Sequence, residues 1–203
     1  MRRISFIGVL CFLAMSIGCG RNPEINPLSE SSVVVAFGNS LTFGTGTEND
    51  LSYPAVLSDM LQCRVINAGV PGEDTTSALD RLPTILRKEK ADLVIICHGG
   101  NDMLRNQNKK ITKQNLGKMI SIVRNAGADV ILIGVPSPGL FLNVPSFYKK
   151  LAKEHDIPYD SDIIADVLSS SSLKSDYVHP NAEGYYKIAQ VITDLINKSQ
   201  KTQ

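Results

Sequence analysis

The chain has 203 residues, and its 21 Lys and Arg residues nearly match its 20 Asp and Glu residues. This balance excludes the broad basic surface of a protein that binds nucleic acid or an anionic membrane. The length favours one domain with a substantial core over two domains, and we expect the partner to be a small molecule.

The N-terminus has the layout of a bacterial signal peptide. Arg2 and Arg3 precede an apolar run over residues 4–15, which is too short to be a comfortable membrane span. We therefore predict that residues 1–18 are a signal that is absent from the mature protein.

Cys19 follows this segment, where a lipoprotein signal carries its lipidated cysteine, although Ser16 stands where leucine is common. We predict lipidation at Cys19, with an ordinary cleaved signal and an uncleaved anchor as the alternatives. Residues 19–30 hold two prolines and several polar side chains, which is typical of a flexible tether. The protein is thus expected to be exported and to meet the membrane only through a lipid, facing the periplasm or the cell exterior.

Residues 31–199 alternate between strand and helix patterns. A continuous apolar and β-branched run over 33–37 is typical of a strand buried in a parallel sheet, and shorter runs recur at 65–66, 93–96 and 130–133, with a weaker one at 157–159. Between these runs, apolar residues recur at helical spacing: Val56, Leu57, Met60 and Leu61; Leu79, Leu82 and Leu86; Leu116, Met119, Ile120 and Val123; and, in a helix that Pro180 could begin, Tyr185, Ile188, Ala189, Ile192, Leu195 and Ile196. This alternation predicts a parallel sheet covered on both faces, a three-layer α/β/α sandwich.

Ligands of such sheets lie beyond the carboxyl ends of the strands. Ser40 follows the first strand in the segment Gly38-Asn39-Ser40, on a turn that exposes its hydroxyl. It is our candidate nucleophile, because backbone N–H groups at the start of a helix or loop favour negative charge there. Considered alone, a serine at this position is more often an N-cap or turn residue.

A serine nucleophile needs a base and a group that orients the base. His179 is one of three histidines, and Asp176 lies three residues before it in a segment that Pro180 keeps out of a helix. Such a loop can place the carboxylate on one ring nitrogen while the other faces Ser40. The alternative is a surface histidine beside a capping aspartate.

The oxyanion of an acyl-transfer intermediate needs hydrogen-bond donors. Asn101 follows the third strand after two glycines, Gly69 follows the second strand, and the Ser40 N–H could be a third donor. Ordinary turn chemistry is the alternative for Asn101 and Gly69.

Taken together and in order, these segments resemble the four blocks of the SGNH (GDSL) hydrolases. The blocks are Gly38-Asn39-Ser40-Leu41, Gly69, Gly99-Gly100-Asn101-Asp102 and Asp176-x-x-His179. The chain is most similar to the bacterial branch with thioesterase I, lysophospholipase and arylesterase activities. The resemblance implies a flavodoxin-like sheet of five parallel strands in the order 2-1-3-4-5, a triad of Ser40, His179 and Asp176, and an oxyanion hole of the Ser40 N–H, the Gly69 N–H and Asn101. It implies no metal and no organic cofactor.

The expected activity is hydrolysis of acyl esters through an acyl-enzyme on Ser40. Asn39 stands where the family usually has aspartate; it keeps one acceptor and loses the charge, so an altered pH profile or rate is expected. Two alternatives remain: a carbohydrate O-acetyl esterase, and a non-catalytic surface lipoprotein that keeps the fold and binds a ligand.

Other residues near the expected site carry weaker expectations. In the strand order that the resemblance implies, the first strand separates Cys63 from Cys97, so both are expected to be free thiols. Met103, Leu104 and residues 140–142 are expected either to line an acyl pocket or to pack in the core or loops.

Overall fold

The computed structural model describes residues 22–139 and 141–201. The predicted signal over residues 1–18 and the predicted lipid site Cys19 lie outside the described residues. In the described part of the chain, no helix is long and apolar enough to cross a membrane.

A five-stranded parallel sheet forms the centre of the molecule. Its strands are β1 (Val33–Gly38), β2 (Arg64–Gly69), β3 (Leu93–Cys97), β4 (Asp129–Ile133) and β5 (Tyr159–Asp160). They are hydrogen-bonded in the order β2-β1-β3-β4-β5, and every neighbouring pair is parallel. The strand order implied by the resemblance is therefore confirmed.

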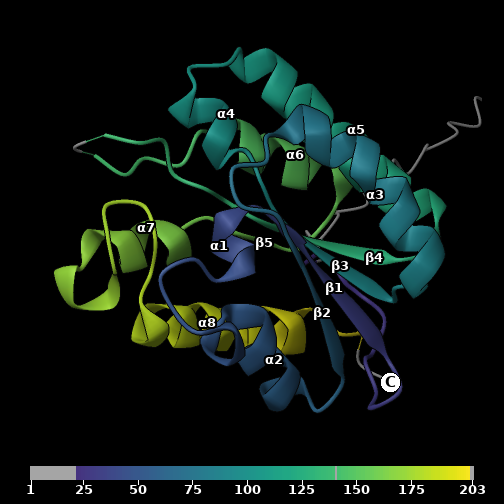
Figure 1. Ribbon diagram of the computed structural model, residues 1–203. Helices are drawn as coiled ribbons and strands as arrows, with labels where there is room; N and C mark the ends of the chain where they lie inside the picture. The colour runs from purple at the N-terminus through teal and green to yellow at the C-terminus, as the bar shows by residue number, and fades with distance from the viewer. Residues whose placement is uncertain (1–21, 140, 202–203) are drawn as a thin grey trace, which may run out of the picture.

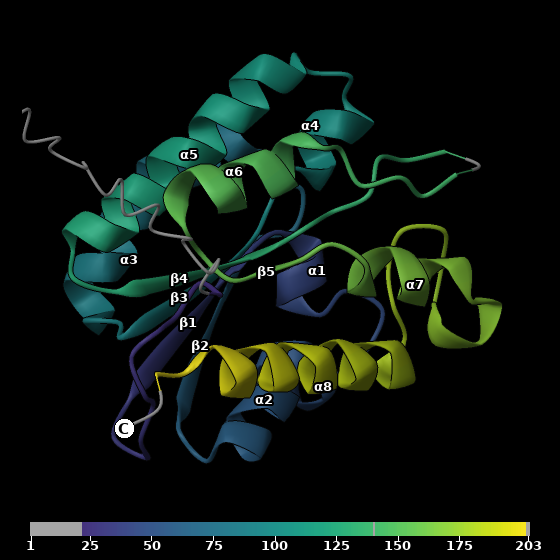
Figure 2. The same ribbon diagram turned by 180° about the vertical axis from the view of Figure 1, so that it is seen from behind.

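Helices cover both faces of the sheet (Figures 1 and 2). Helices α3, α5 and α6 lie over one face, and α2 and α8 lie over the other, which confirms the three-layer sandwich. The helices are α1 (Ser40–Phe43), α2 (Tyr53–Leu61), α3 (Thr75–Glu89), α4 (Gly100–Leu104), α5 (Lys109–Asn125), α6 (Phe147–His155), α7 (Ile163–Ser169) and α8 (Ala182–Ser199), with 3-10 helices at Asn49–Leu51 and Ser171–Leu173.

Burial explains the strand and helix patterns of the sequence. All five residues of β3 are buried, because a central strand between two helical layers has no solvent face. The expected stripe on α5, formed by Leu116, Met119, Ile120 and Val123, is fully buried against the sheet layer. Because helices cover both faces of the sheet, a ligand can reach the sheet only at the ends of its strands.

Some element boundaries differ from the prediction. Helix α8 begins at Ala182 rather than at Pro180, because Asn181 caps it by accepting a hydrogen bond from the Gly184 N–H at 3.0 Å. Pro180 instead forms an isolated bridge with Lys174. Strand β5 contains only Tyr159–Asp160, and helices α6 and α7 were not predicted at all.

The segment predicted to be a tether is in part packed against the domain. Ile25 is 1% exposed, and its N–H donates to the Ser199 carbonyl at 2.8 Å in a bridge beside Gln200. The Asn26 N–H also donates to the Asp129 carboxylate at 2.6 Å. The prediction of a flexible tether is therefore wrong for these residues, which lie at the amino end of the sheet where β4 begins.

Cys63 and Cys97 are free and buried, as expected. Cys63 directly precedes β2, whereas Cys97 ends β3, and β1 lies between these two strands. Burial raises the pKa of the Cys97 thiol to about 12, so this group is inert at neutral pH.

Candidate active site

The turn after β1 presents Ser40 at the N-terminus of helix α1. Gly38 ends the strand, where a Cβ would lie 1.9 Å from the Thr42 hydroxyl, so no other residue fits without movement. The buried Asn39 side chain accepts a hydrogen bond from the Leu41 N–H at 3.1 Å and caps the helix. The Ser40 hydroxyl is thereby fixed at the carboxyl edge of the sheet.

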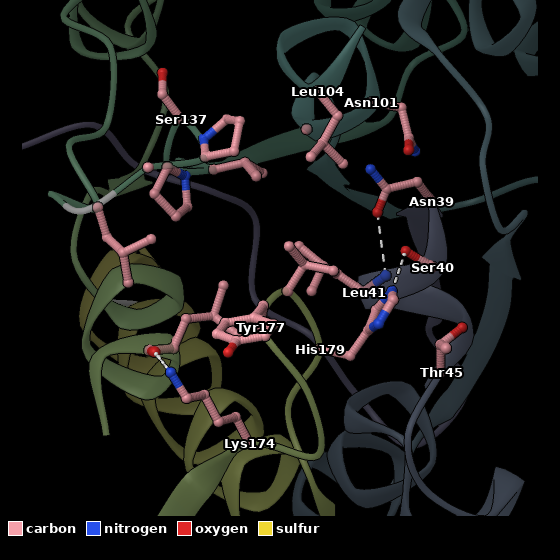
Figure 3. Close-up of a pocket in the computed structure, with 18 of the residues that line it drawn as sticks. Asn39, Ser40, Leu41, Thr45, Asn101, Leu104, Ser137, Lys174, Tyr177 and His179 are labelled. Carbon is pink, nitrogen blue, oxygen red and sulfur yellow. Dashed lines mark hydrogen bonds between the residues drawn. The ribbon is translucent and has the colours of Figure 1, made fainter. Parts of the chain in front are cut away.

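The loop before α8 brings His179 to Ser40 (Figure 3). The distance from His179 Nε2 to Ser40 Oγ is 3.0 Å, and the distance from His179 Nδ1 to Asp176 Oδ2 is 2.7 Å. The structure thus brings together the three residues that the sequence predicts as a triad. An imidazole that donates from Nδ1 to a carboxylate keeps its Nε2 lone pair for the serine proton.

Asp176 is held in place by backbone donors of its own loop. Its Oδ1 accepts from the N–H groups of Val178 and His179 at 2.8 and 2.9 Å. Burial raises the pKa of Asp176, but the hydrogen bonds from His179 and Val178 outweigh it and leave the pKa below its ordinary value. The carboxylate is therefore ionised at neutral pH and can stabilise a positive charge on the ring.

Asn101 lies across the pocket from His179, on helix α4. Its side-chain Nδ2 donates one hydrogen bond to the Glu73 carbonyl at 2.9 Å, and the residue lines the pocket beside Ser40. An amide nitrogen carries two N–H donors, so a second remains for a ligand.

Gly69 does not lie where the predicted donor role requires. Its N–H donates to the Asn67 Oδ1 at 3.0 Å, and the residue is not among those that line the pocket. A Cβ at Gly69 would lie 2.2 Å from the Phe43 backbone nitrogen, so glycine is needed there for close packing of α1 on β2. The predicted place of Gly69 in the oxyanion hole therefore does not fit this geometry, because its N–H is already bonded to Asn67 away from the pocket.

Gly72, which was not predicted from the sequence, lies beside the pocket instead. It lines the pocket in a turn closed by the Glu73 N–H, which donates to the Val70 carbonyl at 3.1 Å. Its φ of +77° after Pro71 is typical of a type II turn, which favours proline followed by glycine. The dipeptide Pro71-Gly72 is the sequence signal that could have found it.

The site opens into a pocket of about 1060 Å³ at the carboxyl edge of the sheet. Its apolar lining comes from the segments that follow the strands and from the segment around α7: Leu41, Pro71, Leu104, Val135, Pro136, Pro138, Phe141, Leu142, Leu168, Tyr177 and Val178. Leu104, Phe141 and Leu142 thus line the pocket, whereas Met103 is buried beside it, and residue 140 is not described. Among the described residues, no group of three or more His, Cys, Asp or Glu side chains could hold a metal ion.

Comparison with known proteins identifies the family of the chain. Residues 36–187 match the GDSL-like Lipase/Acylhydrolase family. The chain is 29% identical over 182 residues to an arylesterase of Vibrio mimicus, with 83% of this chain and 90% of that protein covered. It is also 29% identical over 167 residues to thioesterase 1/protease 1/lysophospholipase L1 of Escherichia coli strain K12, with 78% of this chain and 80% of that protein covered.

A solved structure shares the same fold. The crystal structure of TesA has a TM-score of 0.75 at 24% identity and covers 82% of this chain and 99% of that chain. Since the family match spans the sheet and the loops that carry Ser40, Asn101 and His179, the chain belongs to the GDSL-like lipase/acylhydrolase family and is a carboxylic ester hydrolase.

Proposed function

We propose that this protein is a serine esterase that hydrolyses acyl esters through an acyl-enzyme on Ser40. The observation that carries the proposal is the hydrogen-bonded chain from the Ser40 hydroxyl through the His179 ring to the ionised Asp176. A serine, a base and an orienting carboxylate in this arrangement are the parts of nucleophilic acyl transfer.

In the first half of the reaction, Ser40 Oγ attacks the ester carbonyl carbon while its proton passes to His179 Nε2. The tetrahedral intermediate then expels the alcohol, which takes that proton from His179. In the second half, a water molecule gives its proton to His179 and attacks the acyl carbon, and Ser40 leaves with the proton. Asp176 stays ionised throughout and stabilises the imidazolium.

The oxyanion of both tetrahedral intermediates needs hydrogen-bond donors on the side of Ser40 opposite His179. Three candidates line the pocket: the Ser40 N–H, the Gly72 N–H and the free N–H of Asn101. In the described structure, the Ser40 and Gly72 N–H groups donate no hydrogen bond to another residue, which leaves both available. We therefore assign Gly72 to the role that the sequence gave to Gly69.

The pocket favours acyl chains longer than acetyl. Its volume of about 1060 Å³ reaches the upper end of the ordinary range for ligand sites. Apolar walls accept an aliphatic or aromatic group without cost, whereas a sugar would need polar partners for its hydroxyls. We accordingly place an acyl chain against Leu104, Val135 and Leu142.

Turnover of p-nitrophenyl acetate, butyrate and octanoate tests the proposal. Ser40→Ala is expected to abolish turnover and labelling by a fluorophosphonate probe, while intact-protein mass shows one adduct on the wild-type chain. Ser137→Ala is the matched control, because Ser137 also lines the pocket but its hydroxyl contacts the Met103 sulfur.

Wild-type turnover in Ser40→Ala would refute the mechanism. Absence of both turnover and labelling in the wild type would favour a ligand-binding protein. A preference for acetate over octanoate would favour an O-acetyl esterase.

We further propose that residues 1–18 are a lipoprotein signal and that Cys19 is lipidated in the mature protein. The order of charged, apolar and small residues before Cys19 supports this. Metabolic labelling with an alkyne fatty acid is expected to mark the wild type but not Cys19→Ala. Equal labelling of both would contradict lipidation at this residue.

A further inference from the structure

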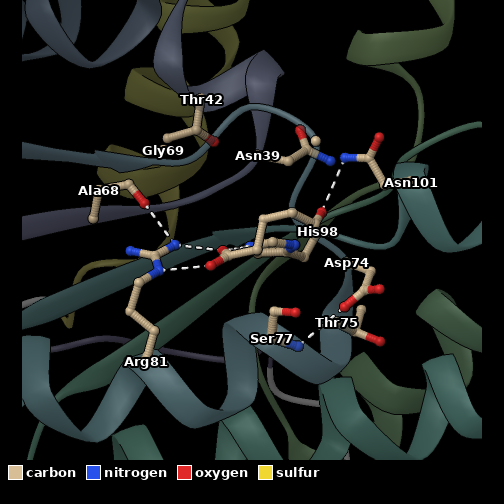
Figure 4. Close-up of polar contacts among 12 residues, drawn as sticks. Asn39, Thr42, Ala68, Gly69, Asp74, Thr75, Ser77, Arg81, His98 and Asn101 are labelled. Carbon is tan, nitrogen blue, oxygen red and sulfur yellow. Dashed lines mark hydrogen bonds and ion pairs between the residues drawn. The ribbon is translucent and has the colours of Figure 1, made fainter.

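A largely buried ion pair joins Glu73, which directly follows Gly72 in the chain, to Arg81, and Figure 4 shows Arg81 beside Ala68 and His98. The Glu73 side chain is 7% exposed and accepts two hydrogen bonds from Arg81 of helix α3. These run from Nε to Oε1 at 2.8 Å and from Nη2 to Oε2 at 2.5 Å. Two parallel bonds between a guanidinium and a carboxylate fix the direction of both side chains.

Arg81 is itself attached to two strands of the sheet. Its Nη2 donates to the Ala68 carbonyl on β2 at 3.1 Å, and its guanidinium carbon lies 4.6 Å from the centre of the Phe37 ring on β1. The second contact is a cation–π interaction, which is strengthened by exclusion of water. The Glu73 carboxylate is therefore tied to the rigid part of the fold.

His98, directly after β3, is the third group in contact with Glu73. It is fully buried, and its Nε2 lies 3.3 Å from Glu73 Oε2 without the alignment of a hydrogen bond. Burial raises the pKa of Glu73, but the contacts with His98 and Arg81 outweigh it, so the pKa lies below its ordinary value. Glu73 is thus a buried, ionised carboxylate.

Stability is a poor explanation for such a pair. Moving two charges out of water costs several kcal/mol, and well-packed apolar side chains often replace buried ion pairs without loss. The place of Glu73 in the chain suggests another role. Its carbonyl accepts the hydrogen bond from Asn101, and its amino-side neighbour is Gly72, so one residue joins two of the three proposed oxyanion donors.

We propose that the Glu73–Arg81 ion pair positions the oxyanion hole by locking the Val70–Glu73 turn to strands β1 and β2. With the carboxylate locked, the Gly72 N–H and the Asn101 amide hold a fixed separation, and no reorganisation is needed when the oxyanion forms. Glu73 and Arg81 are positioning residues, since neither side chain lines the pocket. The inference rests on the proposed function.

Steady-state kinetics of Glu73→Gln and Arg81→Lys test this role. Glu73→Gln keeps the shape of the side chain and loses its charge. Arg81→Lys keeps the charge and loses the guanidinium group that makes two parallel hydrogen bonds. Each is expected to lower kcat by roughly 10- to 100-fold with a change in KM below about threefold, because donors that move act mainly on the transition state. Lys113→Gln is the matched control, since it removes the exposed ion pair with Glu154 and should leave kcat unchanged.

A double-mutant cycle with Asn101→Ala separates positioning from mere folding. If Glu73 acts through the oxyanion donors, the combined loss in kcat is expected to be at least about fivefold smaller than the product of the single losses. Multiplicative losses, or wild-type kcat in a folded Glu73→Gln, would overturn the proposal. If Glu73→Gln does not fold, Arg81→Lys carries the same cycle. If Ser40→Ala keeps turnover, the proposed function fails as well. If Ser40→Ala is inactive but Glu73→Gln is fully active, only the positioning role is refuted.

Discussion

The two sides of the active site are built in different ways. On the base side, Asp176 binds only groups within three residues, and its side chain is 52% exposed. On the oxyanion side, Glu73 contacts Arg81 and His98 and accepts from Asn101, which lie 8 to 28 residues away, and the carboxylate is buried. The base is thus supplied by a short loop, whereas the donors depend on the core of the fold.

This difference predicts how substitutions on each side affect activity and the free energy of unfolding. Changes on the base side should remove activity and leave the free energy of unfolding almost unchanged. Changes on the oxyanion side should lower both, because the same contacts support the chemistry and the packing.

The largest effect is expected for His179→Ala. Loss of the base should lower kcat by roughly 10⁴-fold or more, as in other serine triads. The ring is 18% exposed and loses two hydrogen bonds, but Asp176 keeps its backbone donors, so the free energy of unfolding should change by at most about 1 kcal/mol in urea titration. A loss of stability well above that value would show that the base loop also supports the fold.

Asn101→Ala should have a smaller effect on rate and a larger effect on stability. Removal of one oxyanion donor typically lowers kcat by about 10²–10³-fold. The change also leaves the Glu73 carbonyl without its donor, at a cost of about 1–3 kcal/mol. Kinetics and urea unfolding of the same preparation check both parts, and an unchanged kcat would remove Asn101 from the oxyanion hole.

Two glycine variants distinguish the donors after β2. In Gly72→Ala, the new Cβ meets only Arg105 Nη2 at 3.8 Å, but the φ of +77° adds a strain of about 1–2 kcal/mol. We expect a folded protein whose kcat falls about tenfold as the turn shifts.

In Gly69→Ala, the Cβ collides with the Phe43 backbone, so the main loss is in stability, by about 1–3 kcal/mol or more. A Gly69→Ala variant with full stability and low kcat would restore the original assignment.

The smallest effect concerns acid stability. The pKa of Glu73 is lowered in the folded protein, so its ionised form contributes stability above the ordinary value of 4.5, and this contribution is lost as the pH falls through the folded pKa. The free energy of unfolding of Glu73→Gln should therefore depend less on pH than that of the wild type between about pH 5 and pH 3. Parallel curves for the two proteins would contradict an ionised Glu73.

The sequence predicted the sheet, the triad and Asn101 because each depends on a local pattern. Val33–Phe37 and Leu93–Ile96 are apolar throughout since they are central strands, and Asp176 lies close to His179 along the chain. Ser40 and Asn101 follow strands whose carboxyl ends meet at one edge of a parallel sheet, whereas the loop before α8 brings His179 to that edge.

The features that the sequence missed depend on contacts between distant residues. Gly69 ends β2 and Gly72 lies three residues later, and only the turn geometry and the Asn67 side chain decide which N–H faces the pocket. The pairing of Glu73 with Arg81 spans a turn and two turns of helix, so charge pattern alone does not reveal it. Ile25, in a polar segment rich in proline, gives no local sign that it pairs with a residue near the other end of the chain.

That pairing of Ile25 beside Gln200 determines how an anchored molecule would be oriented. Ile25 lies at the amino end of the sheet, and the pocket opens at the carboxyl end. Five residues lie between Cys19 and Ile25, and even a fully extended chain over these six residue steps spans only about 20 Å. If Cys19 carries a lipid as proposed, the domain would therefore stand with its amino edge toward the bilayer and its pocket facing outward. Such an enzyme would take its esters from the aqueous side and not from the membrane that holds it.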